Sequence, residues 1–138
     1  MSIVQTQTTS FKKELYQAVH NLSTDTVYIA LYTSNADLNA DTTIYDSTNE
    51  VVATGYTAGG QAMTGVAINS SDYTAYVNWD NVSWTASLTA RCALIYNVTQ
   101  GNKSIAVLDF GSDKTSTTTF TITMPANTST TALIRSSN

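Results

Sequence analysis

Apolar residues repeat every three or four positions near the N-terminus and every second position afterwards. The first repeat predicts one α-helix over residues 10–22, with Ser10 as its N-cap and Glu14 facing its positive end. Residues 1–9 are polar and lack a clear period, so we expect an N-terminal arm that is disordered alone or ordered by a partner. The apolar face of the predicted helix consists of Phe11, Leu15, Ala18, Val19 and Leu22.

The alternation of apolar and polar positions after the helix is typical of β-strands. Residues 27–32 place aliphatic side chains on one face and Tyr28, Ala30 and Tyr32 on the other. Residues 90–96 are almost continuously apolar after Arg91, which indicates a central strand buried on both sides. Gly65 suggests a bulge or a close approach. The strands expected besides these cover residues 50–56 (weaker), 62–68, 73–77, 82–84, 105–110, 120–124 and 133–134.

This spacing of short strands predicts a mainly β protein, an antiparallel β-sandwich or barrel with one N-terminal α-helix. The length of 138 residues predicts one domain, residues 10–138 after the arm, without a need for disulfides. The net charge is −4 and the six cations are scattered, so we expect no nucleic-acid partner. No apolar run approaches the length of a membrane span, and residues 1–10 lack the features of a secretory signal.

The chain contains one histidine and one cysteine. His20 lies near the end of the predicted helix, where a cation favours the negative helix terminus, and no nucleophile motif surrounds it. Cys92 lies within the apolar run 90–96, where a buried thiol packs as a hydrophobe. A catalytic cysteine would need a partner histidine, and His20 is the only one in the chain. We therefore expect neither enzymatic activity nor a cofactor.

Two groups of acidic residues raise the question of a metal site. Asp37, Asn39 and Asp41 have the spacing of the first three ligands of a calcium loop, which also needs Gly at position 6 and Glu at position 12. This chain has Thr42 and Thr48 there, so we interpret the segment as a turn whose polar side chains bind backbone N–H groups. A cation held by these three residues remains an alternative. A second alternative is a cation between Asp109 and Asp113.

The aromatic residues raise the question of a sugar-binding face, on which exposed rings would stack. Eight tyrosines and two tryptophans are present, and many of them alternate within predicted strands. Core or interface positions are the simpler interpretation. Carbohydrate binding that uses Trp79 or Trp84 remains open.

Eight sequence blocks resemble, in order and spacing, a family of small structural proteins of tailed bacteriophages, including phages of cyanobacteria. The blocks are distributed over nearly the whole length of the chain, from residue 11 to residue 135, but the family supplies no catalytic residue. Residues 35–41 (NADLNAD) depart from the family pattern by being more acidic, which suggests a different partner or solvent exposure. The blocks are FKKEL (11–15), DTVYIALYTSNADL (25–38), DTTIY (41–45), NEVVATGYTAGG (49–60), WDNVSW (79–84), TARCALIYN (89–97), AVLDFG (106–111) and ALIR (132–135).

The resemblance implies a virion component that is made in the cytoplasm of the host bacterium. We expect a capsid decoration or cement protein that binds the shell as a homo-oligomer, with the major capsid protein or other virion proteins as partners. A neck, tail or baseplate adaptor is the first alternative, and a carbohydrate-binding module for host recognition is the second. The residues expected at the interface are Phe11, Leu15, Tyr32, Tyr45 and Tyr56.

Overall fold

Strand β7 (Thr89–Asn97) is the middle strand of a five-stranded antiparallel sheet. The computed structural model describes residues 2–137, and its β7 side chains are buried on both faces from Cys92 to Asn97, as the apolar run predicted. The sheet has the order β1-β8-β7-β2-β3. Its other strands are β1 (Thr6–Gln7), β8 (Lys103–Thr115), β2 (Val27–Tyr32) and β3 (Gln61–Ala62).

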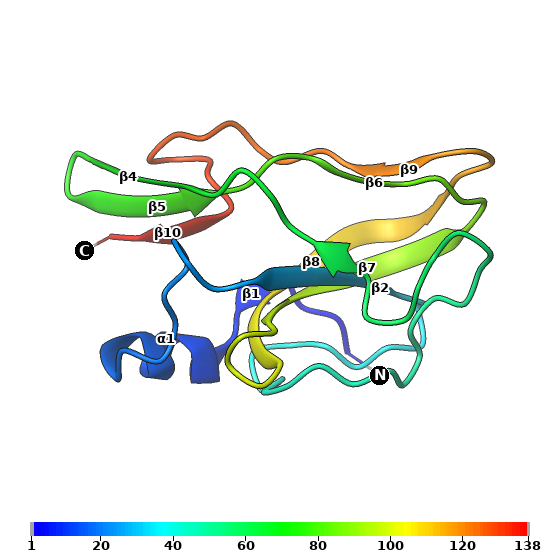
Figure 1. Ribbon diagram of the computed structural model, residues 1–138, viewed down its shortest axis with the longest axis horizontal. Coiled ribbons are helices and arrows are strands. Elements are labelled where there is room, and N and C mark those ends of the chain that lie inside the picture. The colour runs from blue at the N-terminus through cyan, green and yellow to red at the C-terminus, as the bar shows by residue number, and fades with distance from the viewer. Residues whose placement is uncertain (1, 138) are drawn as a thin grey trace.

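A second layer covers one face of this sheet (Figure 1). It consists of a three-stranded sheet, β10-β5-β4, and a two-stranded sheet, β6-β9, all antiparallel. Residues 79–81 connect β5 directly to β6, so the two small sheets lie end to end. The chain is therefore mainly β and sandwich-like, as predicted. The strands of this layer are β4 (Ala67–Ser71), β5 (Thr74–Asn78), β6 (Val82–Trp84), β9 (Phe120–Ile122) and β10 (Ile134–Ser136).

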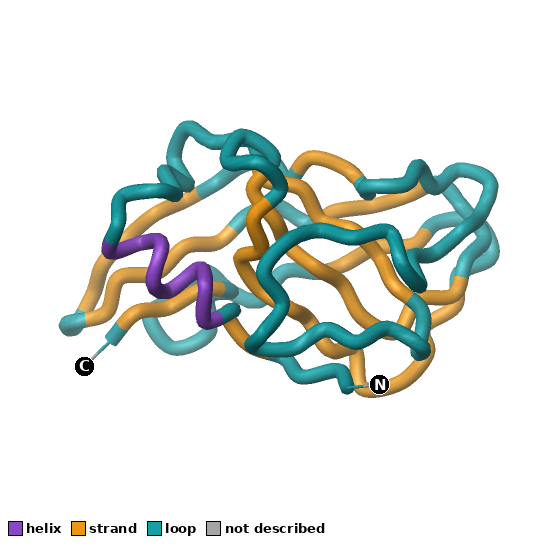
Figure 2. The backbone as a smooth tube through the Cα atoms, turned by 90° about the horizontal axis from the view of Figure 1, so that it is seen from below, coloured by secondary structure: helices purple, strands orange, loops and turns teal. Residues whose placement is uncertain are grey.

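Two apolar clusters occupy the two faces of the five-stranded sheet. The larger cluster lies between the layers and contains Ile29 and Leu31 of β2 together with Trp84 of β6. The smaller cluster contains Ala30 and Tyr32 and lies under the β2–β3 loop (residues 33–60). The alternation along β2 thus fills both clusters, because successive side chains of a strand point to opposite faces. Figure 2 shows the β2–β3 loop spread over the outer face of the sheet.

The helix is shorter than predicted. Helix α1 runs from Thr9 to Tyr16, and its N-cap is Thr8, whose hydroxyl accepts the N–H of Phe11, rather than Ser10. The prediction that it continues to residue 22 was wrong, because Ala18 adopts a φ of 58° and turns the chain away. No helix in residues 2–137 is long and apolar enough to cross a membrane.

The N-terminal segment lies along the domain and is paired within the chain. Strand β1 pairs with β8, and Ile3 forms a bridge with Leu38. Thr8 donates its backbone N–H to the carbonyl oxygen of Ile105 at 3.0 Å. Residues 2–8 are therefore paired within the chain, whereas the sequence pattern predicted an arm that is disordered alone or ordered by a partner.

Two predicted strands differ in the structure. Residues 50–56 form only isolated bridges, because the chain turns back toward the interlayer core there. Residues 62–68 are split between β3 and β4. Gly65 lies at the split with a φ of 67°, and a Cβ atom there would meet the Asp80 carboxyl group at 2.2 Å. The expected close approach at Gly65 is therefore confirmed.

Candidate functional site

A buried carboxylate fastens the β2–β3 loop to the sheet. Glu50 is 7% exposed. Its Oε1 accepts the hydroxyl of Tyr45 at 2.6 Å, and its Oε2 accepts the hydroxyl of Tyr56 at 2.5 Å and the N–H of Gly59 at 2.7 Å. The Tyr56 oxygen in turn accepts the N–H of Leu31 at 2.8 Å, which joins the loop to β2.

Two further tyrosines complete this anchor. The ring of Tyr96 stacks on Tyr45 with centroids 4.7 Å apart, and its hydroxyl donates to the carbonyl oxygen of Gly59 at 2.5 Å. The hydroxyl of Tyr32 donates to the carbonyl oxygen of Asp46 at 2.6 Å. Burial, with the nearby Glu50 charge, raises the pKa of Tyr96 to about 12. The pKa values of Tyr32, Tyr45 and Tyr56 are raised for the same two reasons.

This arrangement changes how the predicted interface residues are understood. Tyr32 and Tyr56 are buried and Tyr45 is half-buried, and all three hold the loop within the chain. Phe11 is fully buried against the interlayer core. Leu15 is 41% exposed and is the one member of the predicted set whose side chain lies on the surface.

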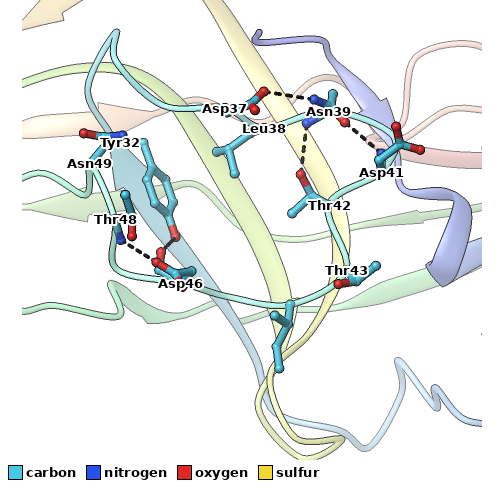
Figure 3. Close-up of a pocket in the computed structure, with 11 residues that line it drawn as sticks. Tyr32, Asp37, Leu38, Asn39, Asp41, Thr42, Thr43, Asp46, Thr48 and Asn49 are labelled. Carbon is cyan, nitrogen blue, oxygen red and sulfur yellow. Dashed lines mark hydrogen bonds between the residues drawn. The ribbon is translucent and has the colours of Figure 1, made fainter. Parts of the chain in front are cut away.

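The acidic segment lines a hollow of about 490 Å³ on the outside of the β2–β3 loop (Figure 3). Asp37 Oδ1 accepts the side-chain N–H of Asn39 at 3.2 Å, and Asn39 Oδ1 accepts the backbone N–H of Asp41 at 2.9 Å. Asp46 accepts the N–H of Thr48 at 2.7 Å, and its hydrogen bonds with Thr48 hold the pKa of Asp46 below its ordinary value. These oxygens thus stabilise turns of the loop. Within residues 2–137, no three His, Cys, Asp or Glu side chains gather as a metal-binding group.

His20 connects the segment after α1 to the end of β7. Its Nε2 lies 2.9 Å from Oε1 of Glu14, and its Nδ1 lies 3.0 Å from the side-chain nitrogen of Asn97. The Asn97 nitrogen also donates to Asp25 at 2.9 Å. Because Asn97 donates to Nδ1, the ring proton lies on Nε2 and is donated to Glu14. The side chain of His20 is fully buried, so its role in the structure is to join these segments.

The remaining candidate residues lie apart from one another. Cys92 is fully buried in β7, and burial raises the pKa of its thiol to about 12. Asp109 pairs with Arg91, and the N–H of Gly111 and the Arg91 guanidinium hold the pKa of Asp109 below its ordinary value. Asp113 lies four residues along β8 and is exposed.

The tryptophans named for sugar binding face the interior. Trp79 and Trp84 are each 5% exposed. Trp84 packs at 5.9 Å from Tyr56 and at 6.3 Å from Phe120 in the interlayer core. Neither ring has a free face on which a sugar could stack. The exposed aromatic residues are Tyr16 and Tyr73, which are 94% and 95% exposed.

These two tyrosines lie at the same end of the molecule, where α1 and the β4–β5 turn project (Figures 1 and 2). A groove of about 450 Å³ lies there between α1 and the three-stranded sheet, and we name it the α1 groove. Leu15 and Tyr16 line it on the helix side, and Ile68 lines it on the sheet side. Lys12 of α1 and Arg135 of β10 also line it, as do Phe11, Leu22, Ala75, Tyr76, Val77 and Ile134.

Strand register explains why the sheet side of the groove is apolar. Ile68 pairs with Val77, and Val77 pairs with Ile134, so these side chains form one row across β4, β5 and β10. Ile68 is 50% exposed at the end of the row, whereas Ile134 is 5% exposed. The row is thus a part of the interlayer core that continues outward into an open groove. Sequence periodicity missed this site, because it predicted a strand over residues 73–77 and gave no sign that Leu15, Tyr16 and Ile68 come together.

Comparisons with protein-family models, with curated proteins and with solved structures found no match for this chain.

Proposed function

We propose that this chain is a non-enzymatic structural protein of a tailed-phage particle, a capsid decoration or cement protein that binds the shell through the α1 groove. The virion setting rests on the resemblance of the sequence blocks. The structural observation that carries the proposal is the α1 groove itself, where Leu15, Tyr16 and Ile68 expose apolar surface beside the sandwich. Exposed apolar surface of this kind marks protein-binding sites.

The charges at the groove indicate the chemistry of the segment that binds. Lys12 and Arg135 line it in a chain whose net charge is −4. An apolar segment of the shell protein that carries acidic residues would satisfy both the groove and these two cations. Decoration proteins bind at many equivalent positions, so a modest affinity at each groove is multiplied by avidity where copies are linked.

Copy number in purified particles is the first test. A decoration protein is present at every equivalent position of the shell, in hundreds of copies, whereas a neck or tail adaptor forms a ring of about six or twelve. Quantitative mass spectrometry of particles that encode this chain measures the difference. Absence of the chain from purified particles would refute the proposal, and a ring-sized copy number would favour the adaptor.

A matched pair of variants tests the groove. Tyr16→Ala removes an aromatic ring that is 94% exposed at the groove, and Val52→Ala shortens a side chain that is 97% exposed on the β2–β3 loop. Both residues make little contact within the chain, so neither substitution should disturb folding. We expect Tyr16→Ala to reduce occupancy on stripped particles about tenfold or more, since burial of one tyrosine stabilises an interface by more than 1.4 kcal/mol. Val52→Ala should bind as the wild type does.

A further inference from the structure

Strand β4 has an unusual sheet edge. It lies at the edge of β10-β5-β4, pairs only with β5, and all its residues except Ala67 are exposed. It has five residues, whereas every other edge strand described in residues 2–137 has two or three. Its sequence, AINSS, contains no charge and no proline. Natural proteins protect long edge strands with charged residues or proline. An edge without them is suited to pairing with another strand.

We infer that two copies of this chain associate through β4, antiparallel, about a two-fold axis at Asn69. A two-fold axis perpendicular to the sheet keeps each residue on the same face in both copies. Residues that lie opposite each other also share a face, so the residue at the axis must lie opposite its own counterpart. Asn69 is the middle residue of Ala67–Ser71, so the axis at Asn69 is the one that pairs all five residues of both strands. The result is a six-stranded sheet shared by the two copies. This inference goes beyond the proposed function.

The distribution of charge favours a second copy as the occupant of this edge. Each chain carries a net charge of −4, which opposes self-association through most surfaces. In this register the paired strands are neutral, and Asp72 lies opposite Val66 of the other copy. The two Asp72 carboxylates are six residues apart along the sheet, about 20 Å, which exceeds the screening length of about 8 Å at physiological salt. A parallel arrangement would place them side by side.

Exposed apolar side chains beside the edge supply further buried area. Ile68 is 50% exposed and lies diagonal to Ile68 of the other copy, at roughly 7–8 Å, within reach of long side chains. Tyr73 is 95% exposed in the turn and comes next to Val66 of the other copy. A stable interface needs about 1,000 Å² or more, and each buried tyrosine contributes about 150–250 Å². The ladder and these side chains contribute a large part of that area.

The conformation of Tyr73 is consistent with a role outside the monomer. Asp72 and Tyr73 form the two-residue turn between β4 and β5, with φ values of 51° and 70°. Glycine or asparagine normally occupies such positions, and a tyrosine there is strained. Within the monomer nearly all of the Tyr73 side chain is exposed, so contacts in the chain do not compensate the strain.

Charge substitutions at the two-fold axis test this register. In the dimer, N69K places two ammonium groups opposite each other, and N69D places two carboxylates there, so like charges repel. In the monomer, residue 69 is exposed and either charge is solvated. Each variant should raise the dimer dissociation constant about tenfold or more. Its circular dichroism spectrum, and its unfolding midpoint at a concentration where the wild type is also monomeric, should stay unchanged. An equimolar mixture should form a heterodimer with near wild-type affinity, because opposite charges then face each other. Asn69→Thr, uncharged and β-branched, is the control that should keep the dimer.

Sedimentation equilibrium of the isolated protein and native mass spectrometry of the mixture measure these outcomes. The inference is overturned if the wild type is monomeric, if N69K and N69D associate as the wild type does, or if the mixture forms no heterodimer. These measurements need no phage particles, so their failure is distinct from failure of the proposed function.

Discussion

Replacement of the buried carboxylate of Glu50 tests whether this group holds the β2–β3 loop. Glu50→Gln keeps the size of the side chain but replaces one acceptor oxygen with a donor. The Tyr56 oxygen already accepts the N–H of Leu31, so its own proton must go to residue 50. The glutamine oxygen will therefore face Tyr56 and Gly59, and its amide will face Tyr45, whose half-buried hydroxyl can turn to accept.

The expected loss follows from the three hydrogen bonds. Bonds to a charged group contribute about 1.5–3 kcal/mol each, and neutral bonds about 0.5–1.5 kcal/mol. Loss of the charge weakens all three, and the lower desolvation cost of a neutral amide offsets part of this. We therefore expect a loss of about 2 kcal/mol for Glu50→Gln. Glu50→Ala leaves the Tyr56 hydroxyl and the Gly59 N–H buried without a partner, for a loss of about 4 kcal/mol.

Urea and thermal unfolding measure these values. For 138 residues, an unfolding entropy of about 2.1 cal/mol/K per residue converts a loss of 1 kcal/mol into a fall of about 3.5 °C in the unfolding midpoint. The midpoint should fall by about 7 °C for glutamine and about 14 °C for alanine. Asp46→Asn is the matched control, because Asp46 is an exposed carboxylate of the same loop whose bond to Thr48 an asparagine can also make. A Glu50→Gln protein as stable as the wild type would show that desolvation of the carboxylate cancels its hydrogen bonds, and the anchor would be refuted.

Three other predictions concern pH, backbone conformation and thiol reactivity. The folded pKa of Tyr96 is raised from 10.0 to about 12, so the unfolded chain loses this proton first. The stability that this group provides is complete below pH 10 and should be lost as the pH rises toward 12, and Tyr96→Phe should reduce that loss in urea titrations at alkaline pH. Gly60→Ala would place a Cβ atom 1.8 Å from the Ile29 carbonyl oxygen, whereas Gly111→Ala meets nothing within 4 Å although its φ is also positive. In chemical denaturation, we expect Gly60→Ala to lose about 3 kcal/mol or more of unfolding free energy and Gly111→Ala to lose about 1 kcal/mol. Equal losses would contradict the close approach at Gly60. Cys92 is fully buried with a raised thiol pKa, so a thiol reagent should label it only as the chain unfolds, and rapid labelling of the native protein would be inconsistent with its position in β7.

The parts of the fold that were predictable depend on local periodicity. The alternation of residues 27–32 and the apolar run of residues 90–96 identified β2 and β7 and the burial of their faces. The spacing of Asp37, Asn39 and Asp41 was correctly interpreted as a turn, because side-chain bonds to nearby backbone are also local.

The parts that were missed depend on contacts between distant segments. Ala18 and Val19 continue the helical spacing, yet the chain turns at Ala18 so that His20 reaches Glu14 and Asn97. The local spacing of residues around position 18 contains no information about a contact with Asn97, which is far away in the sequence. The weaker strand expected at residues 50–56 failed for the same reason, since the chain there follows the anchor at Glu50.

The candidate site was only partly predictable. Leu15 was named from the helical face, and it does lie at the α1 groove. For the tyrosines, core and interface positions were both open, and Tyr32 and Tyr56 were named as interface residues. Their hydroxyls bond groups within the domain, so the core interpretation holds for these two. Tyr16 and Tyr73 were missed, and their exposure depends on how far α1 and the β4–β5 turn project from the sandwich.

The pairing of β1 with β8 also determines when the binding surface comes into existence during translation. Thr6 pairs with Val107, and Thr8 is held by the carbonyl oxygen of Ile105, so the N-terminal segment has no sheet to join until residues 105–107 have been synthesised. Such long-range pairing slows folding. The α1 groove is also lined by Ile134 of β10, so it forms only once that strand has joined the sheet. A newly made subunit cannot present the α1 groove to a partner before its own core is complete.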